Sequence, residues 1–150
     1  MRAEIENYEG VEVYKTAHEL VVEIYRITAT FPAYERYRLT DQLCRSAASV
    51  PANIAEGYGR YHRREIIRFL YIARGSAEET RYHLLLAKDL GYIDGDTCQR
   101  LRNRYTDVSK MLSRLIAYHK QKFEEERASG TGSGMGHRAP GLGSRPGHWA

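Results

Sequence analysis

Apolar residues recur along most of the chain at alternating intervals of four and three residues. This is the period of a helix that buries one face. The first stripe predicts a helix from about residue 11 to 31, since Pro32 disfavours helical backbone in the residue before it. Its members are Val13, Ala17, Leu20, Ile24, Ile27 and Phe31.

Three further stripes predict three more helices. One begins near Leu39 and continues past Pro51 to about residue 57, with a kink expected at the proline. The next spans about residues 62–90, and the last about 97–123. No run of alternating apolar and polar residues predicts a strand. Short connections between four such helices predict an all-α protein, an antiparallel up-down-up-down four-helix bundle over residues 1–127.

The composition changes at residue 128. Residues 128–150 contain seven of the thirteen glycines and two of the four prolines, with few apolar side chains. Such a segment cannot bury enough apolar surface to offset its chain entropy. We therefore expect residues 128–150 to form a disordered C-terminal tail.

Several sequence features bear on the cellular compartment. No apolar run is long enough to cross a bilayer, and the first residues lack the apolar region of a signal peptide. Cys44 and Cys98 are too few for a disulfide framework. We expect a cytoplasmic protein with reduced cysteines and no membrane partner.

Motifs for catalysis or for cofactor binding are missing from the sequence. It has neither a glycine-rich phosphate loop nor a Cys-x-x-Cys pair. No glutamate precedes a histidine by three residues, as di-iron bundles require. Glu79 and His83 lie one helical turn apart, but a single pair of this kind is typical of an ordinary helix contact. The expectation is a protein without catalytic residues, cofactor or metal.

The modest net charge of +4 is unevenly distributed. Residues 1–23 carry six glutamates against two basic residues, whereas residues 99–122 carry seven basic residues against one aspartate. A basic last helix suggests contact with a polyanion.

The segment from Ser49 to Arg68 invites two interpretations. The first is structural: polar side chains bond a neighbouring helix, and a glycine allows close packing. Its residues are Pro51, Asn53, Glu56 and Gly57. The second is nucleic-acid binding, because arginines interleaved with aromatic rings suit phosphate contact and base stacking, although a solvated surface fits equally well. Its residues are Arg60, Tyr61, Arg63, Arg64 and Arg68.

The predicted helix over residues 62–90 carries more apolar surface than one seam of a bundle needs. Surplus apolar surface on a helix is typical of an association site. Phe69, Ile72 and Leu86 are therefore candidate contacts between subunits of a homo-oligomer.

Several strings resemble the bacterial four-helix bundle family that is also called the 23S rRNA intervening-sequence protein family. They are AHELV at 17–21, SVPANIAEGYGR at 49–60, FLYIA at 69–73, GS at 75–76 and LLLAKDLGY at 84–92. The resemblance covers residues 11 to about 120. It implies an antiparallel bundle, a ring-like homopentamer and no established catalytic activity. A similar bundle is the accessory protein of diversity-generating retroelements, where it binds reverse transcriptase and nucleic acid.

Two hypotheses for the function follow. The leading one is a non-enzymatic, oligomeric scaffold that contacts RNA or a nucleoprotein partner through basic helix surfaces. The alternative is a protein-binding adaptor, such as the reverse-transcriptase accessory subunit of a retroelement.

Overall fold

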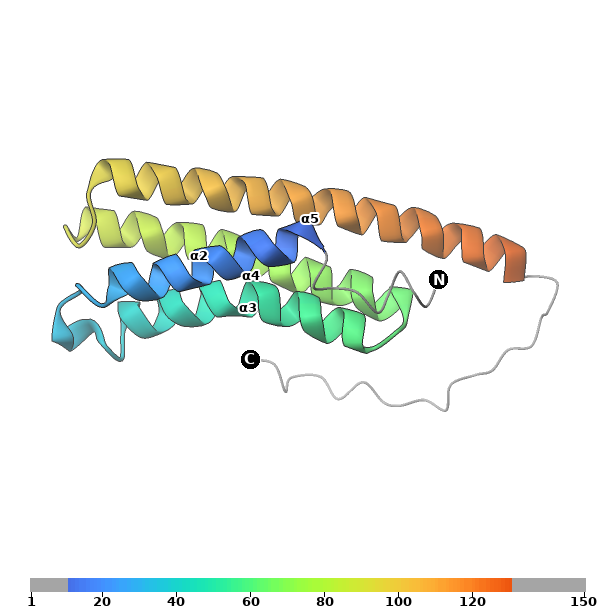
Figure 1. The fold of residues 1–150 in the computed structure, drawn as a ribbon, viewed down its shortest axis with the longest axis horizontal. Helices are drawn as coiled ribbons and strands as arrows, with labels where there is room; N and C mark the ends of the chain where they lie inside the picture. Colours follow the sequence, from blue (N-terminus) through green and yellow to red (C-terminus); the bar gives the residue numbers. More distant parts are fainter. Residues whose placement is uncertain (1–10, 131–150) are drawn as a thin grey trace.

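A computed structural model describes residues 11–130. Its elements are α2 (Glu12–Thr28), the short 3-10 helix η2 (Ala33–Glu35), α3 (Leu39–Gly59), α4 (Arg63–Asp89) and α5 (Gly95–Gly130). Figure 1 shows the four long helices side by side along one axis, with the chain reversing direction at each connection. The structure has no strand within the described range. The predicted all-α four-helix fold is confirmed.

The apolar stripes of the four helices meet in one core. Each helix contacts its neighbour in sequence, and α2 also contacts α5, which closes a four-sided bundle. Side chains from every predicted stripe are fully buried. Among the largest are Leu20, Ile24, Leu43, Ile54, Ile66, Leu70, Leu84, Leu101, Tyr105 and Leu112.

The helix boundaries follow local capping. The helix α2 ends at Thr28, earlier than predicted, and Phe31 instead packs its ring 5.3 Å from that of Tyr92. The helix α5 begins at Gly95, where the Asp94 carboxylate accepts a 2.6 Å hydrogen bond from the backbone N–H of Thr97. That bond favours the charged carboxylate and lowers the pKa of Asp94.

The last helix is longer than the sequence pattern predicts. It continues past Phe123 to Gly130, so residues 128–130, assigned to the tail, belong to α5. Good helix formers and the Lys122–Glu125 ion pair, 3.6 Å long, favour this extension. The remainder of the predicted tail, residues 131–150, lies outside the described residues.

Because of this extension, α5 is longer than the other three helices of the bundle. Figure 1 shows α5 projecting past the end of α3 and the beginning of α4. The described part of the chain supplies no fourth helix alongside this end, because α2 starts only at Glu12. Within residues 11–130, no helix combines the length and the apolar character that crossing a bilayer requires.

Candidate nucleic-acid interface

The structure buries one of the five residues predicted to contact nucleic acid. Arg63 is only 4% exposed, because the extended α5 covers it. Its Nη1 lies 2.7 Å from His119 Nδ1, and its Nε donates to Glu126 Oε1 at 2.6 Å. The guanidinium of Arg63 is engaged inside the bundle and offers little surface to a phosphate, so we do not include Arg63 in the candidate interface.

Two more of the predicted arginines cover an aromatic ring. Arg60 and Arg68 each form a 3.0 Å ion pair, with Glu56 and Glu65 respectively. Their guanidinium carbons lie 5.4 Å and 4.6 Å from the centre of the Phe69 ring. Phe69 is only 3% exposed within a single chain. In a single chain the ring therefore offers little surface to another subunit, and its role between subunits stays a prediction.

The other two predicted residues remain on the surface. Arg64 is exposed, and Tyr61 is 49% exposed. Tyr61 has a φ of 56°, a left-handed backbone conformation that costs free energy in a non-glycine residue. The turn between α3 and α4 thus presents an aromatic ring to solvent in a strained conformation.

The polar side chains of the 49–60 segment form hydrogen bonds and ion pairs mainly within α3. Asn53 Nδ2 donates to the backbone oxygen of Ser49 at 2.7 Å and to its hydroxyl at 2.8 Å. That hydroxyl lies 2.9 Å from the Ser76 hydroxyl, which connects α3 to α4. Pro51 is buried within α3. The predicted bonds from Asn53 and Glu56 to a neighbouring helix are not seen among the described residues: Asn53 bonds Ser49 of its own helix, and Glu56 pairs with Arg60 on the exposed side of α3.

Gly57 of α3 lies close against α4 at Phe69. A Cβ atom added at Gly57 would lie 2.8 Å from Phe69 Cβ and 3.4 Å from the Cα of Ile66. Such distances leave no room for a side chain. This glycine is needed for helix packing.

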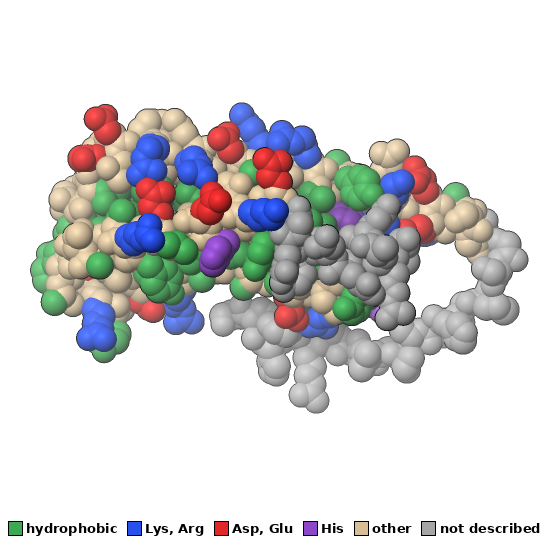
Figure 2. Space-filling view, viewed as in Figure 1, with side chains coloured by type: hydrophobic (Ala, Val, Ile, Leu, Met, Phe, Trp, Pro, Cys, Tyr) green, Lys and Arg blue, Asp and Glu red, His purple; other side chains and the backbone are tan. Residues whose placement is uncertain are grey.

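The charge asymmetry of the sequence is partly compensated within the bundle. Arg100 of α5 lies 2.5 Å from Glu23 of α2, and Arg104 lies 3.7 Å from Glu19. Figure 2 shows acidic and basic side chains interleaved on this side of the molecule. The acidic first helix and the basic last helix are therefore partners, and this side is a weak candidate for a polyanion.

Basic residues without such partners gather where α4 and α5 run side by side. We define the α4–α5 basic face as Arg64, Tyr71 and Arg74 of α4 with Lys120 and Arg127 of α5. In each helix two of these residues are seven positions apart, about two turns, and so lie on one side.

Tyr71 joins the two helices of this face. Its hydroxyl accepts a hydrogen bond from Lys120 Nζ. The guanidinium carbon of Arg74 and Lys120 Nζ lie 4.8 Å and 5.0 Å from the centre of its ring. Arg74 Nη1 also donates to the Ser113 hydroxyl at 3.2 Å. Because cations flank the ring, Tyr71 holds two positive charges in place and is a poor stacking platform for a base.

The four cations of this face have no anionic partner inside the described chain. No carboxylate of residues 11–130 lies within 4.0 Å of any of them. The exposed Glu124, one turn from both Lys120 and Arg127, reduces the local charge but leaves it positive. N–H donors on positively charged groups suit phosphate oxygens.

Comparison with known proteins places this bundle in a family. The family described as 23S rRNA-intervening sequence protein matches residues 9–114. The chain belongs to this family. No curated protein matches it.

A solved structure of the family type has the same fold. It is a protein of unknown function from the S23 ribosomal protein family of Bacteroides thetaiotaomicron VPI-5482, with a TM-score of 0.62 and 29% sequence identity. The similarity covers 69% of this chain and 97% of that one. The match to the 23S rRNA-intervening sequence family ends before Lys120 and Arg127, so these two residues lie beyond the shared region.

The sequence did not reveal Tyr71, Arg74, Lys120 and Arg127 as a group. The seven-residue spacing between Arg64 and Tyr71, and between Lys120 and Arg127, was visible in the sequence. The contact between Tyr71 and Lys120 depends on how α4 and α5 are aligned along their lengths. A local sequence pattern does not predict that alignment. Within this member of the 23S rRNA-intervening sequence family, a cross-helix contact therefore defines the site.

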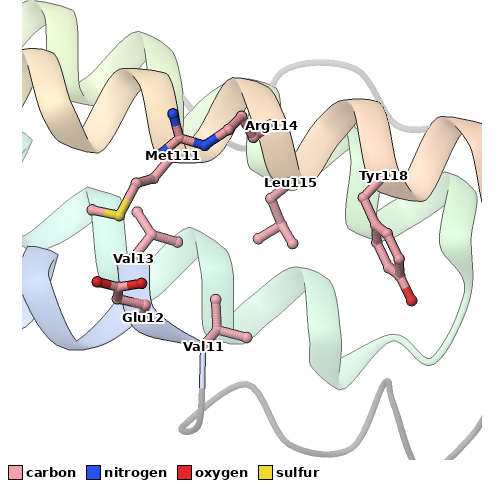
Figure 3. A pocket seen from close by; sticks show the side chains of 7 residues that line it. All are labelled: Val11, Glu12, Val13, Met111, Arg114, Leu115 and Tyr118. Carbon is pink, nitrogen blue, oxygen red and sulfur yellow. The ribbon is translucent and has the colours of Figure 1, made fainter.

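The other surface grooves and polar pairs are weaker candidates for a functional site. A shallow groove of about 300 Å³ lies at the start of α2. Figure 3 shows its lining side chains, which are chiefly apolar but include the charged Glu12 and Arg114. His83 Nε2 lies 3.4 Å from Glu79 Oε1, the one-turn contact that the sequence suggested. No group of three or more His, Cys, Asp or Glu within residues 11–130 could hold a metal ion.

Proposed function

We propose that the protein is a non-enzymatic, oligomeric, cytoplasmic scaffold that binds RNA through the α4–α5 basic face. The observation that carries the proposal is the gathering of four cations along two adjacent helices, without a carboxylate partner among residues 11–130 and with two of them held by Tyr71. The family description, which refers to 23S rRNA intervening sequences, supports RNA as the polyanion.

The side chains of the α4–α5 basic face determine how it would recognise RNA. Guanidinium and ammonium groups contact phosphates, which are the same in every sequence. Tyr71 is occupied by its own cations, so few groups remain to identify bases. We therefore expect weak sequence preference and strong dependence on salt.

The wild-type chain should bind labelled single-stranded RNA in an anisotropy titration at low salt. Each neutralised phosphate contributes about −0.7 to the slope of log affinity against log salt, so four contacts give a slope of about −3 per chain. Absence of binding at 50 mM salt, or a slope near zero, would refute the proposal.

Self-association is the second part of the proposal. Ile72 of α4 and Leu90, the residue that caps the end of α4, are 36% and 49% exposed. They lie eighteen residues apart, which is five helical turns, and hence on one side of this helix and its cap. Half-buried Leu86 lies between them on that side. Exposed apolar residues aligned along a helix favour contact with another chain. A ring of five subunits, which the family resemblance implies, would repeat the α4–α5 basic face around an axis.

We expect light scattering at micromolar concentration to give a mass several times the 17.3 kDa of one chain. The double substitution Ile72→Glu/Leu90→Glu should lower that mass, because it places charge on the exposed apolar side of α4. Tyr25→Glu, which changes a 55% exposed residue of α2, is the matched control and should leave the mass unchanged. A wild-type protein of monomer mass would contradict this part of the proposal.

The same exposed side of α4 supports a second candidate function, that of a protein-binding adaptor. Tyr82 is 58% exposed, and with Ile72 and Leu90 it offers aromatic and aliphatic contacts of the kind enriched at protein interfaces. A reverse transcriptase is the partner that the family resemblance suggests. If the protein bound a reverse transcriptase stably but did not bind RNA, this result would favour the adaptor function.

A further inference from the structure

Two ion pairs define how α2 and α5 are aligned along their lengths. Arg100 of α5 lies 2.5 Å from Glu23 of α2. Four residues further along α5, Arg104 lies 3.7 Å from Glu19, which is four residues earlier in α2. One residue forward in α5 therefore corresponds to one residue backward in α2, as expected for two antiparallel helices with the same rise per residue.

This alignment brings Met111 of α5 beside Glu12, the first residue of α2, and both line the groove shown in Figure 3. Past this level the groove continues along α5, where its lining residues are Arg114, Leu115 and Tyr118. Leu115 is half-buried, and Tyr118 is 40% exposed. Figure 3 shows both side chains pointing from α5 toward the side where α2 begins. The groove therefore lies where an extension of the chain before α2 would run.

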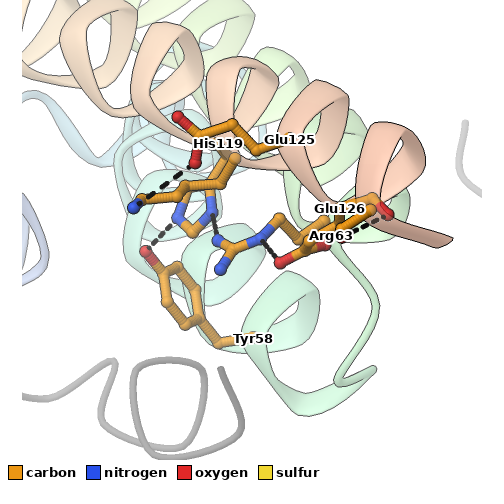
Figure 4. A network of polar contacts seen from close by, with 7 residues as sticks. Tyr58, Arg63, His119, Glu125 and Glu126 are labelled. Atoms are coloured by element: carbon orange, nitrogen blue, oxygen red, sulfur yellow. Dashed lines mark hydrogen bonds and ion pairs between the residues drawn. The ribbon is translucent and has the colours of Figure 1, made fainter.

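The other three helices are in contact with one another beside this groove. Figure 4 shows His119 of α5 between Tyr58 of α3 and Arg63 of α4. The Tyr58 hydroxyl lies 2.8 Å from His119 Nε2, and Arg63 Nη1 lies 2.7 Å from His119 Nδ1. These contacts are one helical turn beyond Leu115. The groove thus occupies the fourth position of the bundle, which α2 fills over the rest of its length.

Arg114 gives the groove a positive charge. This residue is exposed, and no carboxylate of residues 11–130 lies within 4.0 Å of its guanidinium nitrogens. A guanidinium beside partly covered apolar side chains suits a ligand that carries a carboxylate next to an apolar group. The chemistry of the groove fits an acidic segment of chain with large apolar side chains.

The chain that precedes Val11 has this chemistry. Residues 1–10, which lie outside the described residues, read MRAEIENYEG and contain three glutamates against one arginine. Ile5 and Tyr8 are interspersed with these glutamates. Because Val11 itself lines the groove, this acidic segment is joined directly to the site that it would occupy.

The length of the groove indicates which residues of the segment would fill it. Tyr118 lies seven residues beyond Met111, about 10 Å along α5. The backbone of Val11 is extended, and three further residues of extended chain, at about 3.3 Å each, span the same distance. Tyr8 and Glu9 are the third and second residues before Val11. They are therefore close enough in the chain to reach the whole groove.

We propose that this groove is the docking site of the chain's own N-terminal segment, residues 1–10. The Tyr8 ring packs against Leu115 and Tyr118. The Glu9 carboxylate accepts hydrogen bonds from the Arg114 guanidinium. The docked segment completes the fourth side of the bundle at this end. None of these residues belongs to the α4–α5 basic face, so this proposal and the proposed function can fail independently.

Zero-length coupling of the full chain tests the contact between Glu9 and position 114. Arg114→Lys keeps the positive charge and supplies an amine, which a carbodiimide joins to a carboxylate in contact with it. Glu12→Gln in the same chain removes the carboxylate at the start of α2. Peptide mass spectrometry should then find position 114 joined to Glu9. The matched control is Ser113→Lys in the Glu12→Gln chain, because Ser113 contacts Arg74 of α4, and it should give no link to Glu9.

Substitutions of the ring test the apolar part of the docking site. Tyr8→Ala should reduce the yield of the link several-fold, because it removes the buried aromatic surface. Tyr8→Phe, which keeps the ring, and Asn7→Ala should retain the yield. An unchanged yield in Tyr8→Ala would show that the ring does not hold the segment in the groove, and would overturn the proposal.

An equal mixture of ¹⁵N-labelled and unlabelled chains, refolded together, shows which chain supplies Glu9. Docking within one chain predicts linked peptides that carry a single isotope. Linked peptides that carry both isotopes in about half of the cases would show that the segment docks on a second copy. That result would overturn the proposal, as would equal yields from Arg114→Lys and Ser113→Lys or a missing link in both.

Discussion

Replacing Gly57 with alanine should lower the free energy of unfolding by about 1–3 kcal/mol. The new Cβ would lie 2.8 Å from Phe69 Cβ and 3.4 Å from the Cα of Ile66, so α3 and α4 would have to separate. Phe69 cannot swing aside easily, because its own Cβ is fixed to the backbone of α4. The higher helix propensity of alanine, about 1 kcal/mol, offsets only part of this cost.

The matched control is Gly75→Ala in the interior of α4. No atom lies within 4 Å of a Cβ added there. The same substitution should therefore raise the free energy of unfolding by about 0.5–1 kcal/mol, through helix propensity alone. Urea denaturation of both variants measures the two changes. If Gly57→Ala proved as stable as Gly75→Ala, the close approach of α3 and α4 at Gly57 would be wrong.

The helices could be predicted from the sequence because each buries a single stripe. Leu20, Ile54, Leu84 and Leu112 are fully buried, as their spacing indicated. Spacing of apolar residues at intervals of four and three is a local property of one helix, and it does not depend on which helix packs against it. The end of α5 was predicted less well, because its last turns bury few apolar residues and depend on polar contacts such as Arg63–Glu126.

The candidate site could be predicted only in part, because charge in a sequence does not reveal its partner. Arg63 and Arg64 are neighbours in sequence, yet the first is buried against His119 and the second is exposed. Arg100 and Lys120 both belong to the basic last helix, but only Arg100 has a glutamate of α2 opposite it. Which cations remain unpaired depends on the register between helices, and this is a tertiary property.

The double substitution Arg74→Ala/Lys120→Ala should weaken RNA binding about 25-fold at 100 mM salt. Each lost phosphate contact to a single strand reduces affinity by roughly fivefold at that salt concentration. Helix content and oligomer mass should be unchanged, because both side chains lie at the surface and their contacts with Tyr71 and Ser113 contribute little to stability.

Arg26→Ala/Arg36→Ala is the matched control for this experiment. It removes the same net charge from two exposed cations that also lack an ion pair within the described chain. These residues belong to α2 and to the connection after it, and neither is part of the α4–α5 basic face. A general effect of net charge would affect both double variants equally.

The most direct test of RNA binding through the α4–α5 basic face is the salt dependence of affinity for these two variants and the wild type. The measurement is anisotropy with labelled single-stranded RNA from 50 to 400 mM salt. We predict that Arg74→Ala/Lys120→Ala flattens the log–log slope by about 1.4, whereas Arg26→Ala/Arg36→Ala leaves it at the wild-type value. Equal slopes for all three proteins would contradict binding through this face.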